Sequence, residues 1–199
     1  MKSSALLTSY QVAIQRRERL RLTTLLSTQM PAAIAEAIWE QREQLLENGQ
    51  IRPRVQFATL LFADLSGFTS ASEHLSPAVL MAWLNHYMAV MTRLIIEYGG
   101  VVDDYAGDGI KANFGVPLST RDDSDRRHAY CALSCALAML DKLRELNADH
   151  AARGLPTVGM RIGIHSGEVV GGTIGDSRRM KFTTIGKAVN QAARLESTE

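Results

Sequence analysis

The stretch Phe57-Ala-Thr-Leu-Leu-Phe-Ala-Asp-Leu-Ser-Gly-Phe-Thr69 joins an apolar run to an acid and a turn of small residues. Six of the seven residues from Phe57 to Ala63 are apolar, which favours a strand covered on both faces of a sheet. Asp64 follows where this strand is expected to end, and the next residues can turn their backbone amides toward an anion. The stretch therefore predicts an acid beside an amide-lined turn, which suits a metal-bound polyphosphate.

Helical and extended patterns alternate after this stretch. Ser76-Pro77 combines an N-cap with proline at the first helical position, and an amphipathic helix is expected from there to Gly99-Gly100. Residues 101–115 predict two short strands joined by a tight turn through Gly107-Asp108-Gly109. A second helix is expected up to about Ala152, followed by strands at 158–167 and 169–175, an extended segment at 181–186 and a helix at 189–196.

This order of elements predicts an α+β fold of the ferredoxin-like type, a split βαβ sheet backed by helices. In that topology the first strand and the hairpin are neighbours, so Asp64 and Asp108 should lie within reach of one metal pair. Two carboxylates favour Mg²⁺ or Mn²⁺, and two such ions about 4 Å apart could activate a hydroxyl and neutralise a leaving phosphate. The alternative is that Asp64 caps the next helix and Asp108 only shapes a turn.

The first 50 residues predict a helical segment that Pro31 divides into two helices. Its apolar residues form a stripe too loose for a regular heptad zipper, so the segment needs a partner, for which a second copy of the chain is a candidate. Asn48-Gly49 is expected to end the second helix. We therefore expect a helical coupling and dimerisation segment at 1–50 and a catalytic domain at 51–199.

Composition limits the classes of partner. The 199 residues carry a net charge of +1 without long runs of one sign, so no nucleic-acid partner is expected. No window holds the about 18 uninterrupted apolar residues of a membrane span, and the first residues lack a signal-peptide core, so a cytoplasmic location is expected. Cys131 and Cys135 lie in an expected helix without a further zinc-ligand cluster, and we interpret both as core residues.

Four ordered motifs between Val55 and Glu196 resemble the signatures of the class III nucleotidyl cyclases: FADLSGFT, DDYAGDGIKANFG, MRIGIHSGEVVGG and FTTIGKAVNQAARLE. The resemblance implies conversion of ATP or GTP into the 3′,5′-cyclic nucleotide and pyrophosphate, by a homodimer with active sites at its interface. Residues 29–39 resemble the segment that couples an upstream sensor to such domains in bacterial receptors. This implies a sensor in the parent protein, which a missing N-terminal part could hold at the cytoplasmic face of the cell membrane.

The same resemblance implies a role for each matched position. It implies metal ligation by Asp64, the Leu65 carbonyl and Asp108, and substrate contacts from Ser66, Gly67, Phe68 and Thr69. Asn190 corresponds to the residue that holds the ribose, and Arg194 to the one that stabilises the α-phosphate in the transition state. These two residues are four positions apart and share one helix face, and a guanidinium fork suits phosphoryl oxygens.

Base selection is the point at which the sequence departs from the family. Thr183 falls at the second base-selecting position and resembles the common bacterial subclass, which favours adenine. At the first position, four residues before Asp108, the family usually has lysine, but this chain has Asp104, whose carboxylate can only accept hydrogen bonds. Lys111 could reach in from the neighbouring strand, although a lysine snorkelling to the surface is the favoured interpretation. ATP is therefore the preferred substrate and GTP the alternative.

A second departure concerns the end of the chain. Family domains continue past the Asn190 and Arg194 helix with further strands and a phosphate-contacting lysine, so we expect these C-terminal strands to be missing. An inactive module that binds nucleotide or only dimerises is therefore a second hypothesis. A polymerase-like or diguanylate-type palm domain would share the split sheet and the two acids, but it gives no reason for this helix. The preferred hypothesis is an adenylate cyclase that uses two divalent cations.

Overall fold

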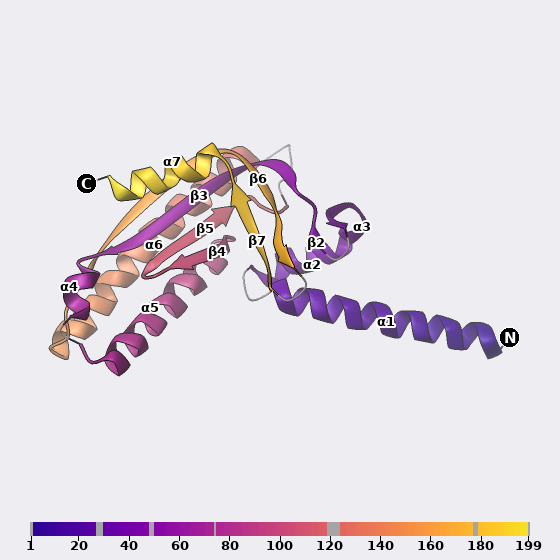
Figure 1. Ribbon diagram of the computed structural model, residues 1–199, viewed down its shortest axis with the longest axis horizontal. Helices are drawn as coiled ribbons and strands as arrows, with labels where there is room; N and C mark the ends of the chain where they lie inside the picture. Colours follow the sequence, from indigo (N-terminus) through magenta and orange to yellow (C-terminus); the bar gives the residue numbers. More distant parts are fainter. Residues whose placement is uncertain are drawn as a thin grey trace.

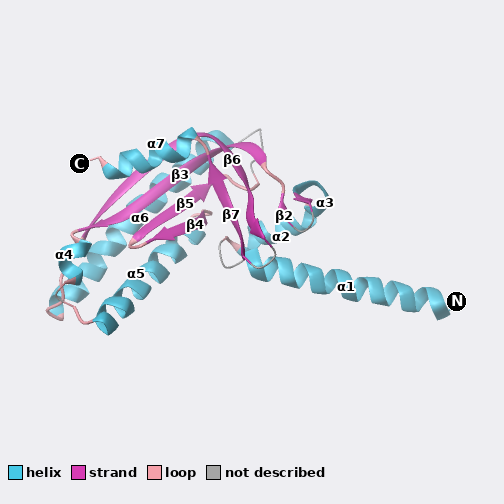
Figure 2. Cartoon of the chain, viewed as in Figure 1, coloured by secondary structure: helices cyan, strands magenta, loops and turns pink. Residues whose placement is uncertain are grey.

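The computed structural model describes residues 2–26, 30–47, 50–73, 75–118, 124–176 and 179–198. In this part of the chain a five-stranded antiparallel sheet forms the centre, and helices cover both of its faces (Figures 1 and 2). A long N-terminal helix projects from one end of the molecule (Figure 1).

The sheet has the strand order β4-β5-β3-β6-β7, with β3 (Arg54–Ser66) in the middle. β3 pairs with β5 (Gly109–Phe114) on one side and with β6 (Gly159–Asp176) on the other. β4 (Val101–Ala106) lies outside β5, and β7 (Arg179–Ile185) lies outside β6. A short and a long helix connect β3 to β4, and one helix connects β5 to β6, so the predicted ferredoxin-like α+β fold is confirmed.

Residues of β3 are buried on both faces of the sheet, as its apolar run predicts. Leu61 and Ala63 belong to the core cluster on one face, whereas Ala58 and Leu60 belong to the cluster on the other. Phe57 is an exception, because it rests against the ring of His128 with centroids 5.9 Å apart and stays 37% exposed. The buried part of the strand thus begins one residue later than predicted.

The helices α5 (Pro77–Glu97) and α6 (Ser124–Ala152) cover one face of the sheet, and α7 (Lys187–Ser197) covers the other (Figure 1). Ser76 caps α5, because its hydroxyl accepts a hydrogen bond from the amide of Val79 at 3.4 Å. The predicted start of this helix at Ser76-Pro77 is therefore confirmed. The short helix α4 (Phe68–Ser72) fills the turn between β3 and α5.

The core between the sheet and these helices explains the apolar composition of α5 and the positions of the two cysteines. By length and composition alone α5 could cross a membrane, but it buries Tyr87, Met91 and Ile95 against the sheet. Cys135 is buried in the same cluster and Cys131 packs against it, and both are free thiols, as predicted.

The N-terminal segment contains α1 (Lys2–Leu26), α2 (Ala32–Glu40) and α3 (Arg42–Leu45), followed by the two-residue strands β1 (Leu46–Glu47) and β2 (Gln50–Ile51). Pro31 precedes α2, as predicted. An ion pair of 2.6 Å between Arg19 and Glu36 joins α1 to α2. The predicted stop at Asn48-Gly49 lies outside the described residues, and the helical part ends earlier, at Leu45.

Two strand boundaries differ from the predictions. β3 continues past Asp64 to Ser66, because these last residues still pair with β6. The two strands predicted over 158–175 are one strand, β6, which pairs first with β3 and then with β7. Its glycines do not break the strand. A Cβ at Gly163 would lie 2.3 Å from the carbonyl oxygen of Ala192, so glycine is needed here for the close packing of α7.

Candidate active site

The two predicted metal acids lie on neighbouring parts of the sheet. Asp64 is on β3, and Asp108 is in the turn that joins β4 to β5, where Ala106 pairs with Gly109. A Cβ at Gly109 would lie 3.2 Å from Oδ1 of Asp64, which shows how closely the hairpin backbone approaches this carboxylate. The sheet therefore brings the hairpin tip and Asp64 together, as the topology predicts.

The charges of these acids affect each other and a nearby tyrosine. Burial raises the pKa of Asp108, and the negative charge of Asp64 raises it further. The hydroxyl of Tyr87 on α5 is buried and has no hydrogen-bond partner among the described residues. Burial raises its pKa, as do the charges of Asp108 and Asp64. A bound divalent cation would relieve the repulsion between the two carboxylates, so these residues fit the predicted metal site.

An arginine that we did not single out from the sequence contacts the same carboxylate. Arg161 on β6 is the register partner of Asp64, and its Nη2 donates to Oδ2 of Asp64 at 2.9 Å. Its Nε lies 3.2 Å from Oε1 of Glu196 on α7. Only the β3–β6 register, which the sequence does not specify, could have identified Arg161 as part of the site, and Glu196 joins it through the packing of α7 on β6.

A cleft of about 220 Å³ opens beside these residues. Its lining consists of Phe62, Ala63, Asp64, Asp104, Ala106, Gly109, Ile110, Lys111 and Glu196. Pockets that enclose a whole small ligand typically measure about 300–1,000 Å³. The cleft of this single chain is thus smaller than a complete nucleotide site.

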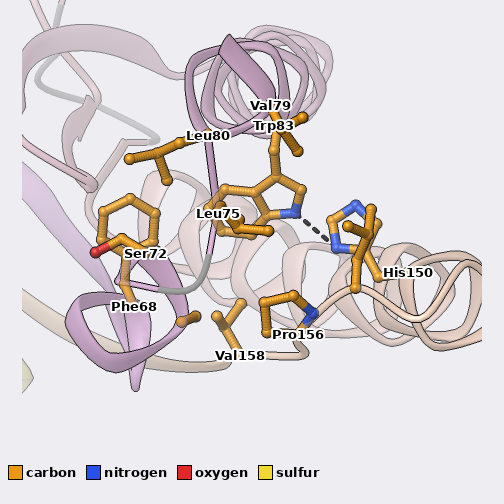
Figure 3. Close-up of a pocket in the computed structure, with 11 residues that line it drawn as sticks. Phe68, Ser72, Leu75, Val79, Leu80, Trp83, His150, Pro156 and Val158 are labelled. Atoms are coloured by element: carbon orange, nitrogen blue, oxygen red, sulfur yellow. Dashed lines mark hydrogen bonds between the residues drawn. The ribbon is translucent and has the colours of Figure 1, made fainter. Parts of the chain in front are cut away.

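The predicted phosphate-binding turn follows directly after β3. Gly67 has a φ of 80°, in the left-handed region that favours glycine, and it precedes the first residue of α4. The ring of Phe68 stacks on Trp83 with centroids 5.3 Å apart (Figure 3). Phe68 therefore anchors the turn through its side chain, and its backbone is the part available to a ligand. Thr69 is exposed, and Ser66 is half-buried.

Asn190 and Arg194 lie on the exposed side of α7. The other side of this helix buries Ala188 and Ala192 against the sheet. Neither Asn190 nor Arg194 is among the described residues that line the cleft beside Asp64. The structure thus presents this pair to solvent and does not bring it to the acids of the same chain.

The predicted base-selecting residues surround a buried acid that the sequence analysis did not identify. The side chain of Asp103 is fully buried, and its Oδ2 lies 2.5 Å from Nζ of Lys111. Lys111 is only 14% exposed, so the interpretation of this residue as a surface lysine is wrong. The reason is the buried charge of Asp103, which needs a cation.

Asp104 and Thr183 differ in their surroundings. Asp104 lines the cleft, but its side chain is 58% exposed and lies 2.7 Å from Nζ of Lys181. Thr183 is buried on β7 and is not among the described residues that line the cleft, and it is its neighbour Thr184 whose hydroxyl donates to Oδ2 of Asp103 at 3.3 Å. Thr184 therefore meets Lys111 at one buried carboxylate, whereas Asp104 is paired with Lys181, which also lies 3.8 Å from Oδ1 of Asp103.

Comparison with known proteins relates this site to one family. The sequence model described as the adenylate and guanylate cyclase catalytic domain matches residues 52–199. An adenylate cyclase of Anabaena cylindrica is 40% identical over 142 residues, which are 69% of this chain and 26% of the relative. The chain thus spans about a quarter of the length of this relative.

Solved structures of both kinds of cyclase are similar to the fold. The adenylyl cyclase CyaB from P. aeruginosa has a TM-score of 0.69 and 34% identity, over 74% of each chain. The guanylyl cyclase Cya2 has a TM-score of 0.66 and 41% identity, over 73% of this chain and 71% of that one.

Proposed function

Because this chain belongs to the adenylate and guanylate cyclase catalytic domain family, we propose that it converts ATP into 3′,5′-cyclic AMP and pyrophosphate. The observation that carries the proposal is the approach of the hairpin tip to Asp64, which places two carboxylates that repel each other beside a cleft. Such a pair fits divalent cations that also bind phosphate oxygens.

In this proposal, Asp64, Asp108 and the Leu65 carbonyl hold two ions, Mg²⁺ or Mn²⁺. When bound, these ions supply charge neutralisation and activation of the ribose 3′-hydroxyl. The backbone of Ser66 to Thr69 binds the phosphates. The in-line attack of the 3′-oxygen on the α-phosphate breaks the bond to pyrophosphate, and the proton of the hydroxyl passes to solvent or to a substrate phosphate.

A second copy of the chain completes the site. Asn190 and Arg194 are exposed and lie outside the cleft of their own chain, which supports their action in the site of a partner. There Asn190 orients the ribose and Arg194 stabilises charge on the α-phosphate in the transition state. The small volume of the cleft supports the same arrangement. In the parent protein, an upstream sensor would act on this dimer through the N-terminal helices.

The relatives include adenylyl and guanylyl cyclases, so guanylate cyclase activity is the second candidate. The observation that favours it is Asp104, whose carboxylate could accept from guanine N1 and N2. Both activities can be measured with the same dimeric protein by following cyclic nucleotide release from ATP and from GTP with Mn²⁺. Release of cyclic AMP alone supports the proposal, and release of cyclic GMP alone supports the second candidate. Tight nucleotide binding without either product would instead support an inactive nucleotide-binding module.

A further inference from the structure

A buried carboxylate fixes the position of Lys111. The Oδ2 atom of Asp103 accepts from Nδ2 of Asn113 at 3.1 Å and from the amide of Thr184 at 3.1 Å. Burial alone would raise the pKa of Asp103, but the charge of Lys111 and the hydrogen bonds hold it below its usual value. Asp103 is therefore ionised and requires the ammonium group of Lys111 as its counter-charge.

The ammonium group of Lys111 has one donor more than this environment uses. An ammonium group carries three N–H donors. One is directed to Asp103, and a second donates to the carbonyl oxygen of Thr184 at 2.9 Å. Among the described residues no third acceptor contacts this nitrogen, and Lys111 lines the cleft that also contains Asp64. One donor of a fixed cation is therefore available to a group that enters the cleft.

The neighbours of Lys111 form a surface suited to a purine. Phe62 is its register partner on β3, and Ala106 and Ile110 line the same cleft. An apolar wall with a few fixed polar groups is the usual construction of a site for a flat heterocycle. The hydroxyl of Thr184 donates to the same carboxylate as Lys111, at 3.3 Å, which helps to fix the position of this donor.

Asp104, the register partner of Lys111 on β4, is a poorer candidate for contact with a base. Its carboxylate is paired with Lys181 at 2.7 Å and is largely exposed. A base that used Asp104 would have to compete with this lysine and with water. The hairpin thus carries a paired acid on β4 and a lysine with a spare donor on β5.

We infer that Lys111, held in place by Asp103, selects the base of the nucleotide, and that this base is adenine. The inference rests on the proposed function. It assigns base selection to Lys111 on β5 and not to Asp104 on β4. The ammonium group donates its third N–H to the unprotonated N1 of adenine, which is an acceptor. Guanine presents N–H groups at N1 and N2, so a donor of Lys111 would face another donor and lose its hydrogen bond.

Equilibrium binding of 3′-deoxy-ATP and 3′-deoxy-GTP with Mn²⁺ tests this inference, because neither analogue can react. We expect the parent chain to prefer the adenine analogue. In Lys111→Met this preference should fall about tenfold, through loss of affinity for the adenine analogue. Lys181→Met is the matched control and should keep the preference, because it removes a lysine that pairs with Asp103 and Asp104 but is not among the described residues that line the cleft.

Lys111→Met leaves the buried charge of Asp103 with only the longer contact of 3.8 Å to Lys181, so Lys111→Met/Asp103→Asn is measured beside it. This double variant removes both charges and should show the same loss of preference in a folded protein. An unchanged ratio of the two affinities in the double variant would overturn the inference, as would equal weakening of both analogues. Cyclic nucleotide release measured in parallel separates the two proposals. If the parent chain releases cyclic nucleotide but the ratio of the two affinities is the same in the variants, only the role of Lys111 is refuted. If the ratio changes in the variants but the parent chain releases no cyclic nucleotide, only the catalytic activity is refuted.

Discussion

The indole Nε1 of Trp83 on α5 donates a hydrogen bond of 2.6 Å to Nδ1 of His150 near the end of α6 (Figure 3). Trp83 also stacks on Phe68, in the turn after β3, and on Tyr87, with ring centroids 5.3 Å and 6.0 Å apart. The pocket around this contact holds only about 10 Å³, so side chains fill it. Trp83 therefore links the end of α6 to the turn expected to bind phosphate.

The stability of the fold should decrease as the pH falls below about 6.5, because Nδ1 of His150 must be unprotonated to accept from Trp83. Burial lowers the pKa of His150, and Arg153 and His86 act in the same direction, whereas Asp149 opposes them. The unfolded chain thus takes up a proton at a higher pH than the folded chain. Between the pKa of His150 in the folded chain and its pKa in the unfolded chain, a lower pH therefore favours unfolding.

Melting temperatures measured from pH 7.5 to 5.5 check this expectation. His150→Gln cannot titrate but can still accept from Trp83, so its melting temperature should depend less on pH than that of the parent. His86→Gln, which changes an exposed histidine on α5, is the control and should retain most of the parent dependence. Identical slopes for the parent and His150→Gln would contradict the role of this hydrogen bond.

Asp108→Asn should make the metal-free protein more stable and abolish its activity. The pKa of Asp108 is raised by burial and by Asp64, so its charged form is destabilised in the folded state and a neutral amide removes that cost. Turnover with Mn²⁺ should fall by about a hundredfold or more, because the stabilisation that a metal supplies is several kcal/mol. Melting temperatures in EDTA measure the stability, and cyclase assays measure the activity.

Asp104→Asn, at an exposed ion pair, is the control and should leave the melting temperature nearly unchanged. A lower melting temperature for Asp108→Asn in EDTA would show that the two acids do not repel each other.

Two inactive variants should restore activity when they are mixed. Asp108→Ala removes the metal acid of one subunit, and Arg194→Ala removes the guanidinium that we assign to the partner's site. In a symmetric dimer, one of the two sites of each mixed pair keeps both groups, so equal mixing should recover about a quarter of the parent activity. Subunit exchange is verified with differently tagged chains. A mixture as inactive as its parents, after exchange, would place each complete site within one chain.

Gly163→Ala should disturb the helix that carries Asn190 and Arg194. The added Cβ would lie 2.3 Å from the backbone of Ala192 and of Glu196, so α7 must move away from β6. Such overpacking typically costs about 1–3 kcal/mol. Denaturant unfolding measures this loss, and turnover should fall with it. Gly171→Ala on the same strand is the control, because its nearest neighbour is the movable end of the Gln56 side chain. Equal losses for the two variants would contradict the special closeness of α7 at Gly163.

Lys111→Met should be far more destabilising than the double change with Asp103→Asn. Breaking a buried ion pair by removing one partner typically costs about 3–5 kcal/mol, because the other charge remains unpaired. Since the side chain of Asp103 is fully buried, removing both charges should recover most of this loss. Urea unfolding of the parent and the two variants provides the comparison. Equal stability of the single and double variants would mean that Asp103 is not ionised in the folded state.

The sequence by itself determined the family and the order of elements. The apolar run after Phe57, the Ser76-Pro77 helix start and the Gly107-Asp108-Gly109 turn are local signals, because each depends on residues adjacent in the chain. Together with the strand order of the split sheet, they were sufficient to place Asp64 beside the hairpin that carries Asp108.

Only the tertiary structure decided how the charges are paired. Arg161 contacts Asp64 through the β3–β6 register, and Lys111 is buried because Asp103, eight positions earlier on the paired strand, is buried too. Neither contact follows from local propensity, since a lysine or arginine on a half-covered strand can equally extend to solvent. The desolvation of a carboxylate depends on every element packed around it, including β7, which arrives about 80 residues later in the chain. The pairing of these charges is therefore a property of the assembled sheet.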